Sequence, residues 1–287
     1  MKSKSITISI LVFDLSDNAI VRTFPFAKIL SKRYKIKIIG PILGQEIYAP
    51  YANEFDYRFI DIDREKNKFF AFILLIRKIL NEIEGDVIYA FKPKITSYGV
   101  ALLAKLFYKT PIVLDIEDFE TVNFHEAGFM KKISFFFRSL NLDNEILNYF
   151  MELLITIADK KVVVSSFFKK KFGGTIIRHG PNVNIFDPNN YEKDENRKKL
   201  KLEEKIKYIL FSGYPREHKG IEELVLAVRN LDRFDLKLLI VGGNKDDTFL
   251  KKILKNNSQF VMHYEAMPHN DMPKLLSAVD IILIPQR

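Results

Sequence analysis

Two basic residues, Arg216 and Lys219, stand in a turn that begins at Gly213 and ends at Gly220. The apolar run before it, Tyr208–Phe211, is typical of a buried strand, and after Gly220 apolar residues recur at helical spacing. A helix start presents free N–H groups and the positive end of the helix dipole, so it favours an anion, and two cations stand beside this one. The stretch therefore predicts a phosphate site. The alternative is an ordinary strand-to-helix turn with solvated cations, because the stretch is neither a P-loop nor a G-x-G-x-x-G fingerprint.

The sequence downstream favours the first reading. A strand ending in VGG at 236–243 and the run LLSAVDIILIPQR at 275–287 follow the turn in order. From Ile209 onward the chain resembles the nucleotide-sugar half of the family 4 glycosyltransferases, retaining enzymes with two Rossmann-like domains (the GT-B fold). The resemblance implies that Arg216 and Lys219 hold the diphosphate of a UDP- or GDP-sugar donor. Tyr214 stands where many members of that family have arginine, so Arg216 is a substitute by position.

The same resemblance extends the donor site to other turns of this half. Gly242 ends the second strand as another turn of close approach, and Glu265 follows the next strand, where relatives bind the nucleobase. The predicted donor-binding residues are Gly213, Arg216, Lys219, Gly220, Gly242, Glu265 and Pro285.

The fold class expected from the whole chain is α/β, with two Rossmann-like domains. Apolar strands alternate with amphipathic helices from the N-terminus onward. We expect residues 1–182 to form the acceptor-side domain and 183–287 the nucleotide-sugar domain. The charged run Glu192–Lys205 is interpreted as part of the linker, with a solvated helix face.

Four acids close together end the strand PIVLDI in the first half: Asp115, Glu117, Asp118 and Glu120. Such a position is where parallel sheets place ligand groups, and the alternative is a solvated turn that caps the next helix. The resemblance implies that this loop contacts the acceptor or the sugar, which makes Glu117 and Asp118 catalytic candidates. His125 is a third candidate, with a structural role as its alternative. The resemblance also implies that no metal is bound, because enzymes of that fold generally neutralise the diphosphate with protein cations and helix dipoles.

Composition bounds the remaining choices. In 287 residues, Lys and Arg exceed Asp and Glu by 45 − 36 = 9, and cysteine is absent. A basic chain favours phosphate-bearing partners, and the absence of cysteine fits a reducing compartment. A Rossmann oxidoreductase would need G-x-G-x-x-G after its first strand, which is not present. A nucleic-acid partner is not expected, because the lysines are dispersed and no binding motif occurs. The alternative function is a non-catalytic nucleotide- or nucleic-acid-binding α/β protein.

The expected activity is transfer of a hexosyl-type sugar, with retention, to a saccharide or lipid-linked acceptor in polysaccharide biosynthesis. We expect a cytoplasmic protein at the inner face of the membrane. Phe129–Leu140 mixes phenylalanines with cations, which suits either peripheral contact with an anionic membrane or core packing. The longest uncharged apolar run, Phe69–Ile76, is too short to span a bilayer.

The last residues carry a further expectation. The family's E-x7-E signature should begin just after Arg287, beyond the strand Asp280–Ile284. We therefore expect a truncated chain with an incomplete second domain, an unfinished donor site and doubtful activity on its own.

Overall fold

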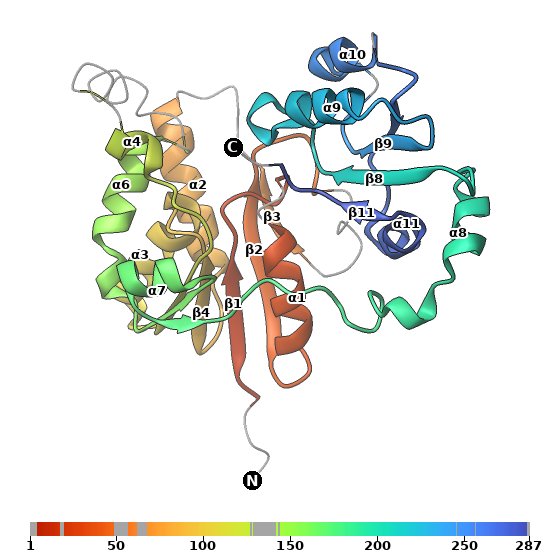
Figure 1. Cartoon of the computed structure of the whole chain (residues 1–287). Helices are drawn as coiled ribbons and strands as arrows, with labels where there is room; N and C mark the ends of the chain where they lie inside the picture. Colours follow the sequence, from red (N-terminus) through yellow and green to blue (C-terminus); the bar gives the residue numbers. More distant parts are fainter. Residues whose placement is uncertain are drawn as a thin grey trace. The chain divides into compact units, whose positions relative to one another are not determined.

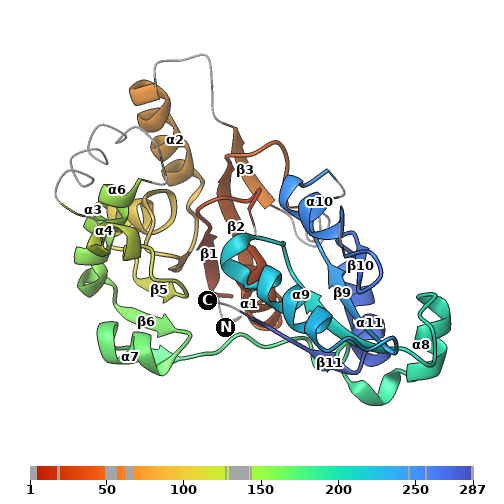
Figure 2. The same cartoon turned by 45° about the horizontal axis from the view of Figure 1, so that its top comes forward.

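A computed structural model of the chain (Figures 1 and 2) describes residues 5–17, 20–48, 57–61, 68–126, 128, 142, 144–244, 246–255 and 257–285. It divides into two compact units, an N-terminal unit, Met1–Gly180, and a C-terminal unit, Pro181–Arg287. Each unit is built on a parallel sheet, so the predicted α/β class with Rossmann-like units is confirmed.

The N-terminal unit contains a seven-stranded sheet in its described part, with the order β3-β2-β1-β4-β5-β6-β7 and every pair parallel. Its strands are β1 (Thr7–Leu11), β2 (Lys35–Ile42), β3 (Tyr57–Asp61), β4 (Val87–Phe91), β5 (Ile112–Ile116), β6 (Lys160–Val163) and β7 (Thr175–Ile176). Side chains alternate between two cores, as strand geometry requires: Ile10 packs in one and Leu11 in the other. Both faces are covered, which explains why the central strands read as continuous apolar runs.

Helices cover the two faces of this sheet. They are α1 (Ile20–Leu30), α2 (Lys68–Glu82), the π-helix η2 (Ile95–Gly99) running into α3 (Val100–Tyr108), α4 (Val122–Glu126), α6 (Glu145–Leu153), the 3₁₀ turn η3 (Ile155–Ile157) and α7 (Ser166–Phe172). The core beneath α1 contains Ile20, Phe24 and Ala27. The opposite core contains Leu75 and Ile79 of α2 with Ala101 of α3. The carboxyl ends of the strands therefore emerge at one edge of a sheet that is closed on both faces.

The C-terminal unit repeats this plan on a smaller scale, with a parallel sheet of order β10-β9-β8-β11 among its described residues. Its strands are β8 (Lys207–Ser212), β9 (Leu236–Val241), β10 (Val261–Tyr264) and β11 (Ile281–Ile282). Its helices are α8 (Lys193–Lys199), α9 (Ile221–Asn230), α10 (Thr248–Lys255) and α11 (Met272–Ala278), with the 3₁₀ turns η4 (Pro188–Asn190), η5 (Glu217–Lys219) and η6 (His269–Asp271). One core lies beneath α9 and α10, and the other beneath α11.

The interpretation of Glu192–Lys205 as a solvated linker is wrong for two of its residues. Asn196 and Arg197 of α8 are buried. The Arg197 guanidinium donates to the Ala278 carbonyl at 2.9 Å and to Asp280 at 2.7 Å. Because an Arg197 stem can pack while its charge is paired, this polar helix docks on α11 and belongs to the C-terminal unit.

Two further expectations concern contact with a membrane. The segment Phe129–Leu140, predicted to lie on a membrane or in the core, falls outside the described residues. Among the helices that are described, none is both long enough and apolar enough to cross a membrane.

Candidate functional site

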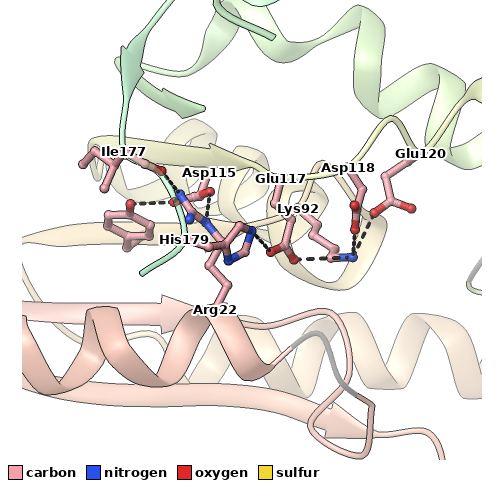
Figure 3. Close-up of polar contacts among 9 residues, drawn as sticks. Arg22, Lys92, Asp115, Glu117, Asp118, Glu120, Ile177 and His179 are labelled. Atoms are coloured by element: carbon pink, nitrogen blue, oxygen red, sulfur yellow. Dashed lines mark hydrogen bonds and ion pairs between the residues drawn. The ribbon is translucent and has the colours of Figure 1, made fainter. Parts of the chain in front are cut away.

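The acidic loop after β5 surrounds the ammonium group of Lys92 (Figure 3). Lys92 Nζ lies 2.6 Å from Asp118 Oδ2, 3.3 Å from Glu120 Oε1 and 3.4 Å from Glu117 Oε1. Lys94 Nζ binds the other oxygen of Glu120 at 2.8 Å. We call Lys92, Lys94, Glu117, Asp118 and Glu120 the Lys92 cluster. The structure thus brings together Glu117 and Asp118, the two carboxylate candidates from the sequence.

Strand pairing explains why the cluster forms. β4 and β5 are adjacent and parallel, with Phe91 opposite Asp115, so Lys92 and the acidic loop leave the sheet side by side. The Lys92 N–H donates to the Asp115 carbonyl at 2.9 Å. Lys92 has a left-handed backbone, with φ of 64°. Such a conformation is costly for a residue with a side chain and persists where surrounding contacts enforce it.

Burial and charge act against each other in this cluster. Burial raises the pKa of Glu117 to about 7, and the nearby Lys92 ammonium only partly offsets the effect. Burial works to lower the pKa of Lys92, but the carboxylates of Glu120, Glu117 and Asp118 outweigh it and raise the pKa overall. Lys92 therefore stays charged, whereas Glu117 exchanges its proton near neutral pH.

A buried ion pair lies beside the cluster and ties α1 to the sheet. Arg22 of α1 makes a bidentate contact with Asp115, at 2.8 Å from Nε and 3.1 Å from Nη2. Its Nη2 also donates to the Ile177 carbonyl at 2.9 Å, and the Tyr89 hydroxyl donates to Asp115 at 2.9 Å. Burial raises the pKa of Asp115, and the Arg22 guanidinium opposes that rise. This pair holds the ends of β5 and β7 in place.

His179, which follows β7, also reaches the cluster. Its Nε2 lies 3.7 Å from Glu117 Oε2. Burial lowers the pKa of His179, and the positive charge of Arg22 adds to the effect. The sequence reasoning assigned no chemistry to His179, Lys92 or Arg22. Only the topology brings them together, because 87 positions separate Lys92 from His179 in the chain.

The remaining catalytic candidate, His125, has a different environment. It lies on α4, with Nε2 3.7 Å from Glu152 Oε1, and its ring packs against Phe119 and Tyr149. Glu152 also binds Lys171 at 3.0 Å. Among the described contacts, none joins His125 to the Lys92 cluster.

In the C-terminal unit, the predicted donor residues lie along the carboxyl edge of the sheet. Ser212, Val241 and Tyr264 are opposite one another in adjacent strands, so Gly213, Gly242 and Glu265 each follow a strand end at the same level. The backbones there approach closely: a Cβ added to Gly242 would lie 2.3 Å from the Gly213 carbonyl oxygen. Only glycine fits that approach.

The turn before α9 is similarly constrained. Gly220 has φ of 67°, and a Cβ added to it would lie 1.9 Å from the Pro285 carbonyl oxygen. Pro285, three residues after β11, therefore packs directly against the start of α9. The described residues of this unit thus contain two close backbone approaches, one between Gly220 and Pro285 and one between Gly213 and Gly242.

The two cations of this turn are available to a ligand. The Arg216 guanidinium stacks on the Tyr214 ring, 4.9 Å from its centroid, and the Tyr214 hydroxyl donates to Asp247 at 3.2 Å. In the part of the chain that the structure describes, neither Arg216 nor Lys219 forms an ion pair. In contrast, Glu222 in the first turn of α9 is paired with Lys252 at 3.0 Å. Asp247 interacts electrostatically with Arg216 without forming an ion pair, so among the described residues an anion at this turn would meet two cations that no carboxylate contacts directly.

The described residues contain no group of three or more His, Asp or Glu side chains placed to hold a metal ion.

Comparison with known protein families gives a match to the C-terminal part of the chain. Residues 192–287 match the model of the family described as glycosyl transferases group 1. The match lies within the C-terminal unit and includes each of the predicted donor residues. Comparison with curated proteins gives no match.

Solved structures resemble the whole chain. Sucrose-phosphate synthase (tll1590) from Thermosynechococcus elongatus aligns with a TM-score of 0.70 and 16% identity, over 99% of this chain and 76% of that one. WaaG, a glycosyltransferase involved in lipopolysaccharide biosynthesis, aligns with a TM-score of 0.66 and 15% identity, over 98% of this chain and 75% of that one. Anabaena Alr3699/HepE, in complex with UDP and glucose, aligns with a TM-score of 0.65 and 12% identity, over 96% of this chain and 73% of that one. At these identities the likeness shows a shared fold alone, the GT-B fold that the sequence leads us to expect.

Proposed function

We propose that this protein is a glycosyltransferase that moves a sugar from a nucleoside-diphosphate sugar to a saccharide or lipid-linked acceptor. The observation that carries the proposal is the turn between β8 and α9. There, Arg216 and Lys219 form no ion pair among the described residues, and they lie on a segment that matches the group 1 glycosyltransferase family.

The chemistry of the donor explains why such a turn is useful. When the bond from the anomeric carbon to the diphosphate breaks, negative charge grows on the departing oxygen. Two cations and the start of α9 stabilise that charge more in the transition state than in the ground state, and this difference accelerates transfer. Gly213, Gly220 and Gly242 let the backbone approach the phosphates, and the segment at Glu265 contacts the base.

The neighbours support the donor and acceptor classes. HepE structures contain UDP with glucose, and UDP-glucose, which favours a UDP-sugar here over a GDP-sugar. WaaG takes part in lipopolysaccharide biosynthesis, which supports a glycan or lipid-linked acceptor in polysaccharide biosynthesis. In more detail, the proposal is that this protein is a family 4 glycosyltransferase and that it transfers hexosyl groups with retention. It works in the cytoplasm, at the inner face of the membrane, and Phe129–Leu140 contributes the peripheral contact.

The N-terminal unit would then serve the acceptor. Glu117 and Asp118 offer carboxylate oxygens at the carboxyl edge of its sheet, where they can accept hydrogen bonds from sugar hydroxyls. His125 is a further candidate for acceptor contact from α4. Since Lys92 already neutralises part of the acidic loop, an uncharged hydroxyl group fits there better than an anion.

Calorimetric titration of UDP, GDP and ADP into the whole chain tests the donor site. We expect one nucleotide to bind in the micromolar range, and the Arg216→Ala/Lys219→Ala double variant to weaken that binding by roughly 100-fold or more, as two charge-assisted contacts are lost. The control is Arg229→Ala/Lys255→Ala, which removes the same charge from α9 and α10 and should bind as the wild type does. If none of the three nucleotides binds the wild-type chain, the proposal fails.

A further inference from the structure

An aromatic ring holds one of the two cations in the turn before α9. The Arg216 guanidinium stands over the Tyr214 ring, 4.9 Å from its centroid. Tyr214 is 52% exposed and Arg216 is also exposed, so both side chains lie on the surface of the C-terminal unit. A guanidinium over the face of a ring gains a cation–π attraction, and this contact uses none of its N–H donors. The ring therefore holds the cation and leaves its hydrogen-bonding groups available.

Pro215 fixes the backbone between these two residues. Proline restricts its own φ and favours an extended conformation in the residue before it. Pro215 is buried, and its ring packs on Gly243, because a Cβ added to that glycine would lie 2.7 Å from Pro215 Cδ. Arg216 is extended, with φ of −141° and ψ of 155°. The proline ring thus packs inside the unit, while the flanking side chains, Tyr214 and Arg216, meet at its surface.

Asp247 supports the ring from the start of α10. The Tyr214 hydroxyl donates to Asp247 Oδ2 at 3.2 Å, and Asp247 Oδ1 accepts from the Leu250 N–H at 2.9 Å. The bond from Leu250 holds the pKa of Asp247 below its usual value, and the Tyr214 hydroxyl and the Arg216 charge add to this effect. One carboxylate therefore joins the ring to the start of a helix, and its charge attracts the guanidinium as well.

The guanidinium held in this way has donors to spare for a ligand. In the part of the chain that the structure describes, Arg216 donates no hydrogen bond and forms no ion pair. A free arginine side chain loses rotamer freedom when it binds an anion, and that loss weakens binding. A side chain that already rests on a ring has lost part of this freedom before the ligand arrives. Stacking on Tyr214 should therefore strengthen the binding of an anion by Arg216.

We propose that Tyr214 is a positioning residue of the donor site, and that its ring, supported by Asp247, holds the Arg216 guanidinium where the diphosphate binds. This inference rests on the proposed donor site. Tyr214 acts through Arg216 and does not contact the nucleotide itself. It also explains how the chain accommodates tyrosine where many proteins that it resembles have arginine: the cation is supplied two residues later, and the ring fixes it in place.

The first test is an NMR measurement on the whole chain without a ligand. The Arg216 Nε–H signal is identified by its absence in Arg216→Lys. It should move in Tyr214→Leu, because the ring that shields this proton is lost, and it should stay near its wild-type position in Tyr214→Phe. The control is Phe234→Leu, which removes a 94% exposed ring from the same unit and should leave the signal unchanged. An Arg216 signal that does not respond to Tyr214→Leu would overturn the stacking.

The second test is calorimetric titration with whichever of UDP, GDP and ADP binds the wild type. Tyr214→Leu should weaken binding by about 5- to 20-fold, since both the cation–π contact and the preorganisation of Arg216 are lost. Tyr214→Phe keeps the ring and loses only the bond to Asp247, so it should weaken binding by roughly 2- to 5-fold. Phe234→Leu should bind as the wild type does. Equal affinities of Tyr214→Leu and the wild type would refute the positioning role.

A double-mutant cycle separates positioning from direct contact and from a general structural role. In the Arg216→Ala background, Tyr214→Leu should cause no further loss of affinity, because the side chain that it positions is already gone. A further loss of the same size as in the wild-type background would show that Tyr214 contacts the nucleotide itself. Melting temperatures of the single variants should match the wild type, and a lower value in Tyr214→Leu would assign its effect to folding.

Failure of this inference is distinguishable from failure of the proposed function. A wild-type chain that binds a nucleotide through Arg216 and Lys219, with no loss in Tyr214→Leu, keeps the donor site and loses the positioning role. A wild-type chain that binds none of the three nucleotides overturns both, whatever the NMR signal shows.

Discussion

Replacement of Asp115 by asparagine tests whether the buried ion pair holds the N-terminal unit together. Both side chains are buried, with 1% exposure for Arg22 and none for Asp115. Asparagine keeps the volume of the side chain but removes the charge, so it leaves the Arg22 guanidinium buried without a counter-charge. Breaking a buried pair in this way costs about 3–5 kcal/mol, and we expect that loss in the free energy of unfolding of this unit.

The measurement is hydrogen exchange of β5 peptides along a urea series, because these peptides report on the N-terminal unit. The control is Asp159→Asn, the same substitution in the same unit at a more exposed pair, in which Asp159 lies 2.7 Å from Lys105. It should cost less than about 1 kcal/mol. Arg22→Met/Asp115→Leu removes both charges of the pair, so this variant should recover much of the loss. If Asp115→Asn costs no more than Asp159→Asn, the ion pair is not what stabilises this edge of the sheet.

Two further predictions concern Glu117 and Gly220. Because the pKa of Glu117 is raised from 4.5 to about 7 in the folded chain, the folded state binds more protons than the unfolded state between these values. The unfolding free energy of the wild type should therefore fall by about 2 kcal/mol from pH 5.5 to pH 8, and Glu117→Gln should lack this fall in urea titrations at the two pH values. An equal pH dependence in both proteins would mean that Glu117 titrates normally. Gly220→Ala should lower the thermal stability of the C-terminal unit, at a cost of about 1–3 kcal/mol, and weaken UDP binding, because its Cβ would meet the Pro285 carbonyl oxygen in a left-handed backbone. Gly128→Ala, where a Cβ meets nothing within 4 Å, is the control, and similar melting of the two variants would contradict the close approach.

The donor half of the site was predictable because its signals are local. An apolar run followed by glycine marks a strand end, and β9 occupies Leu236–Val241, the range that the sequence predicts. The helix after Gly220 was also predictable from the sequence, because its apolar residues recur at helical spacing. They form its buried face: Ile221, Leu224, Val225 and Val228. The assignment of the turn to a sugar donor came from the resemblance, because a cation beside a helix start fits any phosphate.

Side chains whose partners are far away in the sequence were not predictable. Arg197 stands in a run of charged residues that favours a solvated helix, yet it is buried because Asp280 and the Ala278 carbonyl lie opposite it. Lys92 likewise stands in an ordinary basic turn, and its role depends on an acidic loop 25 residues later. Periodicity reports which face of an element is apolar, and it contains no information on which polar groups meet.

The sequence by itself determined the α/β class, the strand ends and the positions of the glycine turns, because backbone conformation and burial are properties of neighbouring residues. It also determined that acids follow β5 and cations follow β8. Only the tertiary structure decided that Lys92 lies among three carboxylates, that Arg22 neutralises Asp115 and that His179 faces Glu117. Parallel strands distant in sequence place their carboxyl ends at one edge, and the proton affinity of each group there depends on the burial and charges that this packing creates.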